Sequence, residues 1–293
     1  APVLLYLAVA RPRVGIPAVG VLAALIAVST VVLNAATGGW YGYYVYTELL
    51  HQQVAQTLWV GFWRDDILHQ QWPLLALIAI GAVAAAVARK RPAAYYFIAA
   101  AGLIGSAWVS RLHTGGYANV LMPAYAATAL LAGLTYGGLT SKLALAKAAA
   151  VLTQLALLIY PIAPQIPTGQ DRTAGAQLIA RLRTLPGPVI VLRHPWYATE
   201  AGKGTFAQEE AIGDVLRSRS RNAAKTLTAS LKAALTTYHV QAVVLDGTFD
   251  LHFFGSELAR DFRLQRQPIT PSRLYPLTDV RTSPTLLYLR KHR

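Results

Sequence analysis

The sequence contains no cysteine and only 13 acidic residues among 293, and both scarcities narrow its function. Without cysteine the chain can form neither a disulfide framework nor a thiolate metal site, and it has no thiol nucleophile. Against the few acidic residues stand 27 Lys+Arg, which give a formal net charge of +14. No nucleic-acid motif accompanies this charge. A basic chain beside a membrane more simply indicates anionic head groups or a phosphate-bearing substrate, so we expect no nucleic-acid partner.

Long apolar runs fill the first 165 residues and predict membrane-spanning helices. A helix needs about 20 apolar residues to cross a hydrocarbon core of roughly 30 Å. The expected spans lie near residues 14–36, 70–88, 93–111, 119–137 and 143–162. Residues 1–9 are also apolar, and because no basic segment precedes them they favour the end of an earlier span over a signal peptide. We therefore expect the chain to be the C-terminal part of a longer membrane protein.

Basic residues lie in alternate connections between the apolar runs, and this pattern predicts an orientation. They are Arg11 and Arg13, then Arg89, Lys90 and Arg91, then Lys142 and Lys147. The positive-inside rule places these connections in the cytoplasm. Residues 37–72, residues 113–119 and everything after Pro164 then face outward. Tryptophan prefers the membrane interface, and five of the six tryptophans map to the outer one: Trp40, Trp59, Trp63, Trp72 and Trp108.

Prolines at positions 161, 164 and 167 end the last run, and a soluble pattern follows. The expected fold is a multi-pass α-helical membrane domain over residues 1–165, followed by a small extracytoplasmic α/β domain over residues 166–293. We expect helices at 174–185, 208–217, 223–238 and 257–261, and strands at 188–192, 240–245, 262–269 and 285–290. The second strand ends at Asp246-Gly247, where folds of this kind usually keep ligands. No Gly-x-Gly-x-x-Gly follows either of the first two strands, so we predict no dinucleotide site.

The outer segment 37–72 is the first candidate site, because it is too long for a simple connection and long loops tend to be functional. Its aromatic rings suit sugar faces and lipid head groups equally. Asp65 and Asp66 are the only aspartates in the membrane half, and adjacent carboxylates can bind a divalent cation or act as a base. They can equally form the first turn of a helix, stabilised by its dipole. His51 and His69 could join them in a metal site, but their spacing matches no compact ligand motif.

The second candidate site is the turn that follows the third expected span. Arg111 closes that span, His113 follows two positions later, and Gly115 and Gly116 allow a tight turn before Asn119. An arginine at the outer end of a helix can simply extend to the head groups. That explanation requires neither the histidine nor the paired glycines. A guanidinium and an imidazole beside backbone N–H groups form a suitable cradle for a phosphate at membrane depth.

The soluble part offers weaker candidates. The segment from His194 to Tyr197, and then Lys203, follow the first expected strand, and a glycine-flanked lysine after a strand can hold a phosphate. The spacing of a Walker motif is missing, so a solvated loop is the simpler interpretation. Glu209, Glu210 and Asp214 share one expected helix, where such a group usually forms a solvated face.

Taken together, these features resemble the GT-C superfamily of polytopic membrane glycosyltransferases, in the bacterial branch akin to the aminoarabinose and protein O-mannosyl transferases. The resemblance rests on the aromatic outer segments, the domain outside the membrane, and the turn that leads from Arg111 into Asn-Val-Leu-Met-Pro-Ala-Tyr at residues 119–125. It implies a polyprenyl-phosphate sugar as donor and transfer on the extracytoplasmic face. It also implies an acidic catalytic residue in a first outer loop, which would precede this chain. Asp65 and Asp66 would then assist acceptor or metal binding.

The expected function is therefore glycosyl transfer from a polyprenyl-phosphate sugar to a glycan, lipid or protein acceptor. The transfer would take place on the extracytoplasmic face of the cell membrane, and membrane lipids would surround the helices. Asp65 and Asp66 are the catalytic candidates, and a divalent cation is the one cofactor to consider. The substrate-binding candidates are Arg111, His113, Tyr117, Asn119, His51 and Arg64. Two other functions stay open. One is a non-catalytic membrane anchor whose outer domain binds an envelope polymer or a partner, and the other is a lipid or solute transporter, which the few polar residues inside the spans disfavour.

Overall fold

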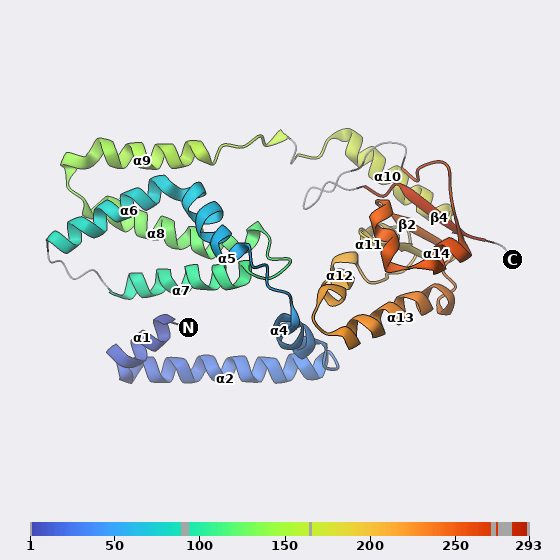
Figure 1. Ribbon diagram of the computed structural model, residues 1–293, viewed down its shortest axis with the longest axis horizontal. Coiled ribbons are helices and arrows are strands. Elements are labelled where there is room, and N and C mark those ends of the chain that lie inside the picture. The colour runs from blue at the N-terminus through green and yellow to red at the C-terminus, as the bar shows by residue number, and fades with distance from the viewer. Residues whose placement is uncertain (1, 89–93, 164–165, 271–273, 275–282, 292–293) are drawn as a thin grey trace. The chain divides into compact units, whose positions relative to one another are not determined.

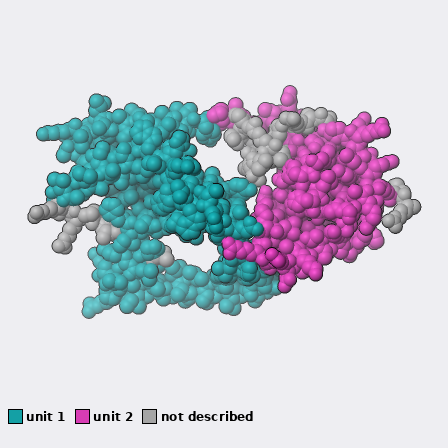
Figure 2. Space-filling view, viewed as in Figure 1, with its two compact units in different colours: residues 1–160 teal, residues 161–293 magenta. Residues whose placement is uncertain are grey.

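The computed structural model describes residues 2–88, 94–163, 166–270, 274 and 283–291 of the chain. The chain divides into two compact units, residues 1–160 (unit 1) and 161–293 (unit 2), drawn in teal and magenta in Figure 2. Unit 1 is helical, whereas unit 2 combines helices with a small sheet (Figure 1). The division falls after Tyr160, whereas the sequence-based boundary lies after residue 165.

Unit 1 consists of α-helices joined by shorter helical turns. The α-helices are α1 (Pro2–Ala10), α2 (Pro12–Ala36), α3 (Trp40–Gly42), α4 (Leu49–His51), α5 (Leu58–Gly61), α6 (His69–Val87), α7 (Ala94–Arg111), α8 (Met122–Gly138) and α9 (Ala144–Leu157). Two turns are π-helical, η1 (Tyr43–Glu48) and η2 (Phe62–Leu68), and two are 3₁₀-helical, η3 (Ala118–Leu121) and η4 (Ser141–Leu143).

Three of the described helical stretches are long and apolar enough to cross a membrane: Pro12–Ala36, Leu58–Val87 and Ala118–Gly138. This indicates membrane association by length and composition. The remaining expected spans correspond to α7, which has 18 residues and ends on Arg111, and to α9, which has 14. Neither is among the three, and α9 ends at Leu157, well before the expected end at residue 162.

The expectation of an outer loop over residues 37–72 is wrong for most of that segment. Residues 40–51 are helical, and from Leu58 one helical stretch runs through η2 into α6. No proline interrupts it before Pro73, and Phe62 and Ile67 are buried against α7 and α8 residues. The charged residues 64–66 lower the apolar content of this stretch, so the sequence pattern hides a helix that packing stabilises.

Polar side chains of α9 complete the hydrogen bonding of its neighbouring helices. Near Pro73 the backbone departs from helical angles at Gln71, and Gln154 Nε2 donates to the Gln70 carbonyl at 3.0 Å. Lys147 Nζ donates to the carbonyls of Tyr136 at 2.9 Å and Leu139 at 3.2 Å. The sequence-based view of Lys147 as a basic residue of a connection is therefore wrong, because this buried lysine caps the C-terminus of α8.

Unit 2 is a mixed four-stranded sheet with helices around it. Its helices are α10 (Gly169–Thr184), α11 (Pro195–Glu200), α12 (Glu209–Arg217), α13 (Arg221–Thr237) and α14 (Ser256–Asp261), with the 3₁₀ turn η6 (Thr248–Phe253). Its strands are β1 (Val189–Val191), β2 (Ala242–Leu245), β3 (Phe262–Leu264) and β4 (Leu286–Arg290). The strand order is β1-β2-β4-β3, in which β1 and β2 are parallel and β4 is antiparallel to both of its neighbours.

The sheet is covered on both faces, which explains the uninterrupted apolar sequences of β1 and β2. Val189 and Val191 belong to a core with α10 residues such as Leu178, whereas Ile190 belongs to a second core with Leu235 of α13. This alternation follows from the two-residue period of a strand. The expected strand at 262–269 is too long, since β3 ends at Leu264.

Candidate functional site

In unit 1, the turn after α7 is paired with the segment between α4 and α5. Ala55 N donates to the Leu112 carbonyl at 2.8 Å, and Thr114 N donates to the Gln53 carbonyl at 3.0 Å. Val54 and His113 form an antiparallel bridge between these hydrogen bonds. The two segments that the sequence singled out separately are therefore joined through their backbones.

Four residues from this region form what we call the Arg111 cluster: Asp66, Arg111, Gly116 and Tyr125. Arg111 Nε donates to Asp66 Oδ2 at 2.8 Å, and Arg111 Nη1 donates to the Gly116 carbonyl. Tyr125 Oη donates to the backbone carbonyl of Asp66 at 3.1 Å. The cluster thus joins η2, the end of α7, the turn and α8.

The Arg111–Asp66 pair is partly buried, so losing either partner would be costly in free energy. The side chain of Arg111 is 22% exposed and that of Asp66 is 16% exposed. A pair shielded in this way is stable only while both partners are present, because either charge alone would be desolvated without compensation. The guanidinium expected to await a phosphate is already paired with a carboxylate, so a phosphate would have to share it or displace Asp66.

Asp65 and Asp66 do not form a pair of converging carboxylates. Asp65 is exposed and accepts from the neighbouring Arg64, with Arg64 Nε at 2.7 Å from Asp65 Oδ1. The π-helical turn η2 sends the two adjacent side chains to different arginines. Such turns are frequent at functional sites, where they redirect side chains.

The other predicted site residues lie at varied depths. His113 Nδ1 is buried and has no hydrogen-bond partner among the described residues. Tyr117 and Asn119 are exposed. His51 is exposed and donates from Nδ1 to the Thr47 carbonyl at 2.6 Å. Within the described residues no three His, Asp or Glu side chains group in a way that could hold a metal ion, so the alternative of a metal site has no assembled ligand set there.

Sequence reasoning missed two features of unit 1. The rings of Trp59 and Trp63 both pack on the ring of Trp108. Their centroids lie 5.0 Å and 5.7 Å, respectively, from that of Trp108. Glu48, at the end of η1, is buried and accepts from Tyr43 Oη at 3.0 Å. Burial and then the Glu48 carboxylate raise the pKa of Tyr43 to about 12. Only the tryptophan content signalled the first feature, and nothing in the pattern distinguished Glu48 from a surface residue.

We expect Gly116→Ala to disturb the turn, because a Cβ there would lie 2.5 Å from the Ser110 carbonyl oxygen and 3.0 Å from Arg111 Cα. Relief requires backbone movement, which typically costs about 1–3 kcal/mol in a packed region. Hydrogen exchange of the amides at residues 112–118 should therefore accelerate. Gly133→Ala is the matched control, since a Cβ at Gly133 meets nothing within 4 Å. Equal protection of the turn in both variants would contradict the expectation.

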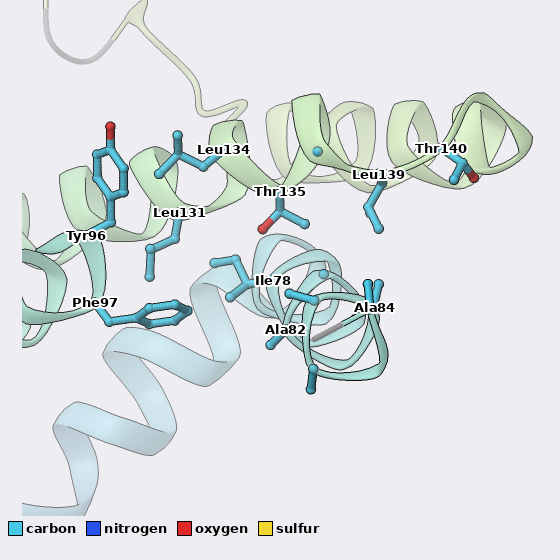
Figure 3. A pocket seen from close by; sticks show the side chains of 15 residues that line it. Ile78, Ala82, Ala84, Tyr96, Phe97, Leu131, Leu134, Thr135, Leu139 and Thr140 are labelled. Atoms are coloured by element: carbon cyan, nitrogen blue, oxygen red, sulfur yellow. The ribbon is translucent and has the colours of Figure 1, made fainter. Parts of the chain in front are cut away.

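A separate apolar cavity of about 540 Å³ lies among α6, α7 and α8. Figure 3 shows Ile78, Phe97 and Leu131 among the side chains that line it. About 20 Å of helix separates Phe97 from Arg111 along α7, so the cavity lies at the other end of that helix from the Arg111 cluster. It is therefore not part of that cluster.

Unit 2 contains a second polar group, which we call the edge cluster: Arg193, His194, Glu209, Asp246 and Asp250. Arg193 Nη2 lies 3.3 Å from Glu209 Oε1, and Arg193 Nε lies 3.2 Å from Asp250 Oδ1. His194 Nε2 lies 2.8 Å from Asp246 Oδ2. Burial raises the pKa of Asp250 and of Glu209, while Arg193 acts in the opposite direction. Arg193 and His194 follow β1, and the two aspartates follow β2, so the cluster lies at the carboxyl edge of the two parallel strands.

One sequence-based interpretation in unit 2 is wrong. Glu209 is buried rather than solvated, because Glu209 N donates to the Leu192 carbonyl at 3.0 Å and holds the start of α12 against the end of β1. Lys203 lies in a loop with exposed neighbours, and its Nζ donates to the Leu185 carbonyl. Glu210 and Asp214 do lie on a more exposed face, where both contact Arg217.

No family model matches the chain, and neither the curated proteins nor the solved structures contain a significant match to it.

Proposed function

We propose that the chain is a membrane glycosyltransferase of the GT-C type, which transfers a sugar from a polyprenyl phosphate to an acceptor outside the cell membrane. The observation that carries the proposal is the partly buried Arg111–Asp66 pair at the turn between α7 and α8. An anchor does not require a phosphate-compatible arginine at this turn. A reaction that releases a phosphate does need a positioned cation.

The chemistry assigns each group a task. An acceptor hydroxyl attacks the anomeric carbon of the sugar, the bond from that carbon to the phosphate oxygen breaks, and the lipid phosphate leaves with the electron pair. Arg111 would stabilise the charge that develops on this oxygen, as a donor positioned before the reaction. Asp66 would orient the guanidinium through the 2.8 Å contact. A carboxylate must also accept the proton of the acceptor hydroxyl.

Transport is less well supported than transfer. Transporters usually place ionisable groups at mid-membrane along the substrate path. Among the lysines that the structure describes in unit 1, Lys147 is the buried one, and its ammonium donates to two carbonyls at the end of α8. It therefore has a structural role that requires no transported ion.

The proposed topology is multi-pass, with the Arg111 turn and unit 2 outside the cell. The absence of cysteine permits a direct test with single cysteines. Ala118 and Ser141 are exposed and lie at opposite ends of the stretch Ala118–Gly138. In intact cells, Ala118→Cys should react with a membrane-impermeant maleimide and Ser141→Cys should react only after permeabilisation. The reverse labelling would place the turn in the cytoplasm and refute the topology.

Transfer itself tests the function. Membranes that contain the full-length protein should move labelled sugar from a polyprenyl-phosphate donor to an acceptor, and membranes without it should not. Retention of the label on the lipid in both samples, across several donor sugars, would favour the anchor instead.

A further inference from the structure

The edge cluster of unit 2 contains more hydrogen-bond acceptors than donors. Among the charged pairs of the described residues, Glu209 and Asp250 share a single arginine, Arg193, and Asp246 contacts only the ring of His194. After the contacts already described, Asp246 Oδ1 and Glu209 Oε2 are buried without a hydrogen-bond partner among the described residues. The Asp246 side chain is only 1% exposed. A buried acceptor without a donor is costly, and in native proteins it calls for an explanation such as a ligand.

His194 adds an acceptor of defined geometry. Its Nε2 lies 2.8 Å from Asp246 Oδ2, so in the neutral ring Nε2 carries the proton that the carboxylate accepts. Nδ1 is then the ring nitrogen with a lone pair, in a side chain that is 16% exposed. Asp246 thus selects the tautomer that can accept a hydrogen bond from a bound molecule.

Aromatic rings border these acceptors. Phe249 lies in η6, is 53% exposed, and packs on the Arg193 guanidinium with 4.6 Å between the guanidinium carbon and the ring centre. The ring of Tyr197 lies 6.0 Å from that of His194, and its neighbour Trp196 is exposed. Burial and the Asp246 carboxylate raise the pKa of the Tyr197 phenol.

The position in the fold agrees with a binding site. The cluster follows the carboxyl ends of β1 and β2, which are adjacent and parallel. Ligands of open α/β sheets bind outside the carboxyl ends of such strands. Thr285 N donates to the Leu245 carbonyl at 3.1 Å, which fixes the end of β2 from the other side.

We propose that the edge cluster binds a sugar. Sugar hydroxyls supply the hydrogen-bond donors that His194 and the carboxylates lack, and the apolar face of a sugar ring can pack on Phe249. An anionic ligand is disfavoured, because the guanidinium of Arg193 already contacts two carboxylates. A metal ion is disfavoured because no three acidic or histidine side chains of the described residues converge on one point. The proposal does not depend on glycosyl transfer at the Arg111 cluster.

Ligand-observed NMR with the chain in nanodiscs tests the proposal, with glucose, glucosamine and inorganic phosphate as probes. Glucose offers only hydroxyl donors, whereas glucosamine also carries an ammonium. Comparing the two therefore shows which kind of donor the site binds. His194→Gln retains an amide N–H that can donate to Asp246 but moves the acceptor from the position of Nδ1 to the amide oxygen, and Phe249→Ala removes the exposed ring. Leu264→Ala in β3 is the matched control, since Leu264 is 47% exposed on the outermost strand at the other side of the sheet.

We expect both sugars to bind, with affinity reduced about tenfold in each of the two cluster variants, as for the loss of one well-placed contact, and unchanged in Leu264→Ala. If His194→Gln fails to fold, Phe249→Ala alone decides. Absence of sugar binding, equal binding in all variants, or binding of phosphate alone would overturn the proposal.

Discussion

Replacing Arg111 with alanine is expected to lower sugar transfer by about 10²–10³-fold, the usual effect of removing one positioned donor from a developing oxyanion. The loss should appear at saturating donor, because the guanidinium acts most strongly on the phosphate that leaves. Arg111→Lys should recover only part of the activity, since an ammonium cannot reach Asp66 and the Gly116 carbonyl in the same planar arrangement. Transfer from a labelled polyprenyl-phosphate sugar in membranes measures both variants.

Arg64→Ala is the matched control for this experiment. Arg64 also contacts an aspartate, but its contact with Asp65 is exposed and local. Exposed pairs contribute little, so this variant should keep nearly full activity. Equal losses in the two arginine variants would show that the effect comes from general surface charge, and unchanged turnover in Arg111→Ala would remove Arg111 from the mechanism.

The second large effect is expected in unit 2, where Arg193→Ala should destabilise the domain by about 3–5 kcal/mol. The substitution leaves Glu209 and Asp250 buried without the cation that contacts both. The free energy of unfolding of a whole domain is typically about 5–15 kcal/mol, so unit 2 would lose a large fraction of its stability. Hydrogen exchange of the β2 amides, which report on global opening, measures the change.

The pH dependence of this variant identifies the cause. Burial raises the pKa of Glu209 and of Asp250 above their ordinary values, and removal of Arg193 takes away the opposing influence. The folded state then binds protons more readily than the unfolded state, so its stability should rise as the pH falls from neutral towards these raised pKa values. Arg260→Ala, which breaks a pair with Asp261 in which the arginine is 59% exposed, should show neither the loss nor the recovery. A loss independent of pH would indicate missing packing rather than unpaired charge.

Local sequence patterns predicted the elements that depend on local rules. The apolar runs at 189–191 and 242–245 became β1 and β2 because both faces of the sheet are covered, and the helix over 209–217 began within one residue of its expected start. The stretch from Leu58 to Leu68 was missed, because its helix is stabilised by Phe62 and Ile67 packing against distant residues. Hydropathy averaged along the chain cannot detect such contacts.

The candidate sites show the same limit. Arg111, His113 and Asp66 could be singled out individually, yet the 2.8 Å pair between Arg111 and Asp66 joins residues 45 positions apart. Arg193 attracted no attention, because an arginine after a strand has no local signature and its partners lie far along the chain. Side-chain pairing over such distances is a property of the fold, whereas composition and spacing describe only neighbours.

The position of β4 between β2 and β3 has a consequence for biosynthesis. Residues 286–290 supply the central pairing partner of a sheet whose other strands are all made earlier. Until the ribosome has released them, β2 has an open edge and β3 has no strand to pair with. Unit 2 should therefore complete its fold only after translation has passed Arg290, and chains that stop sooner should be recognised as unfinished and degraded.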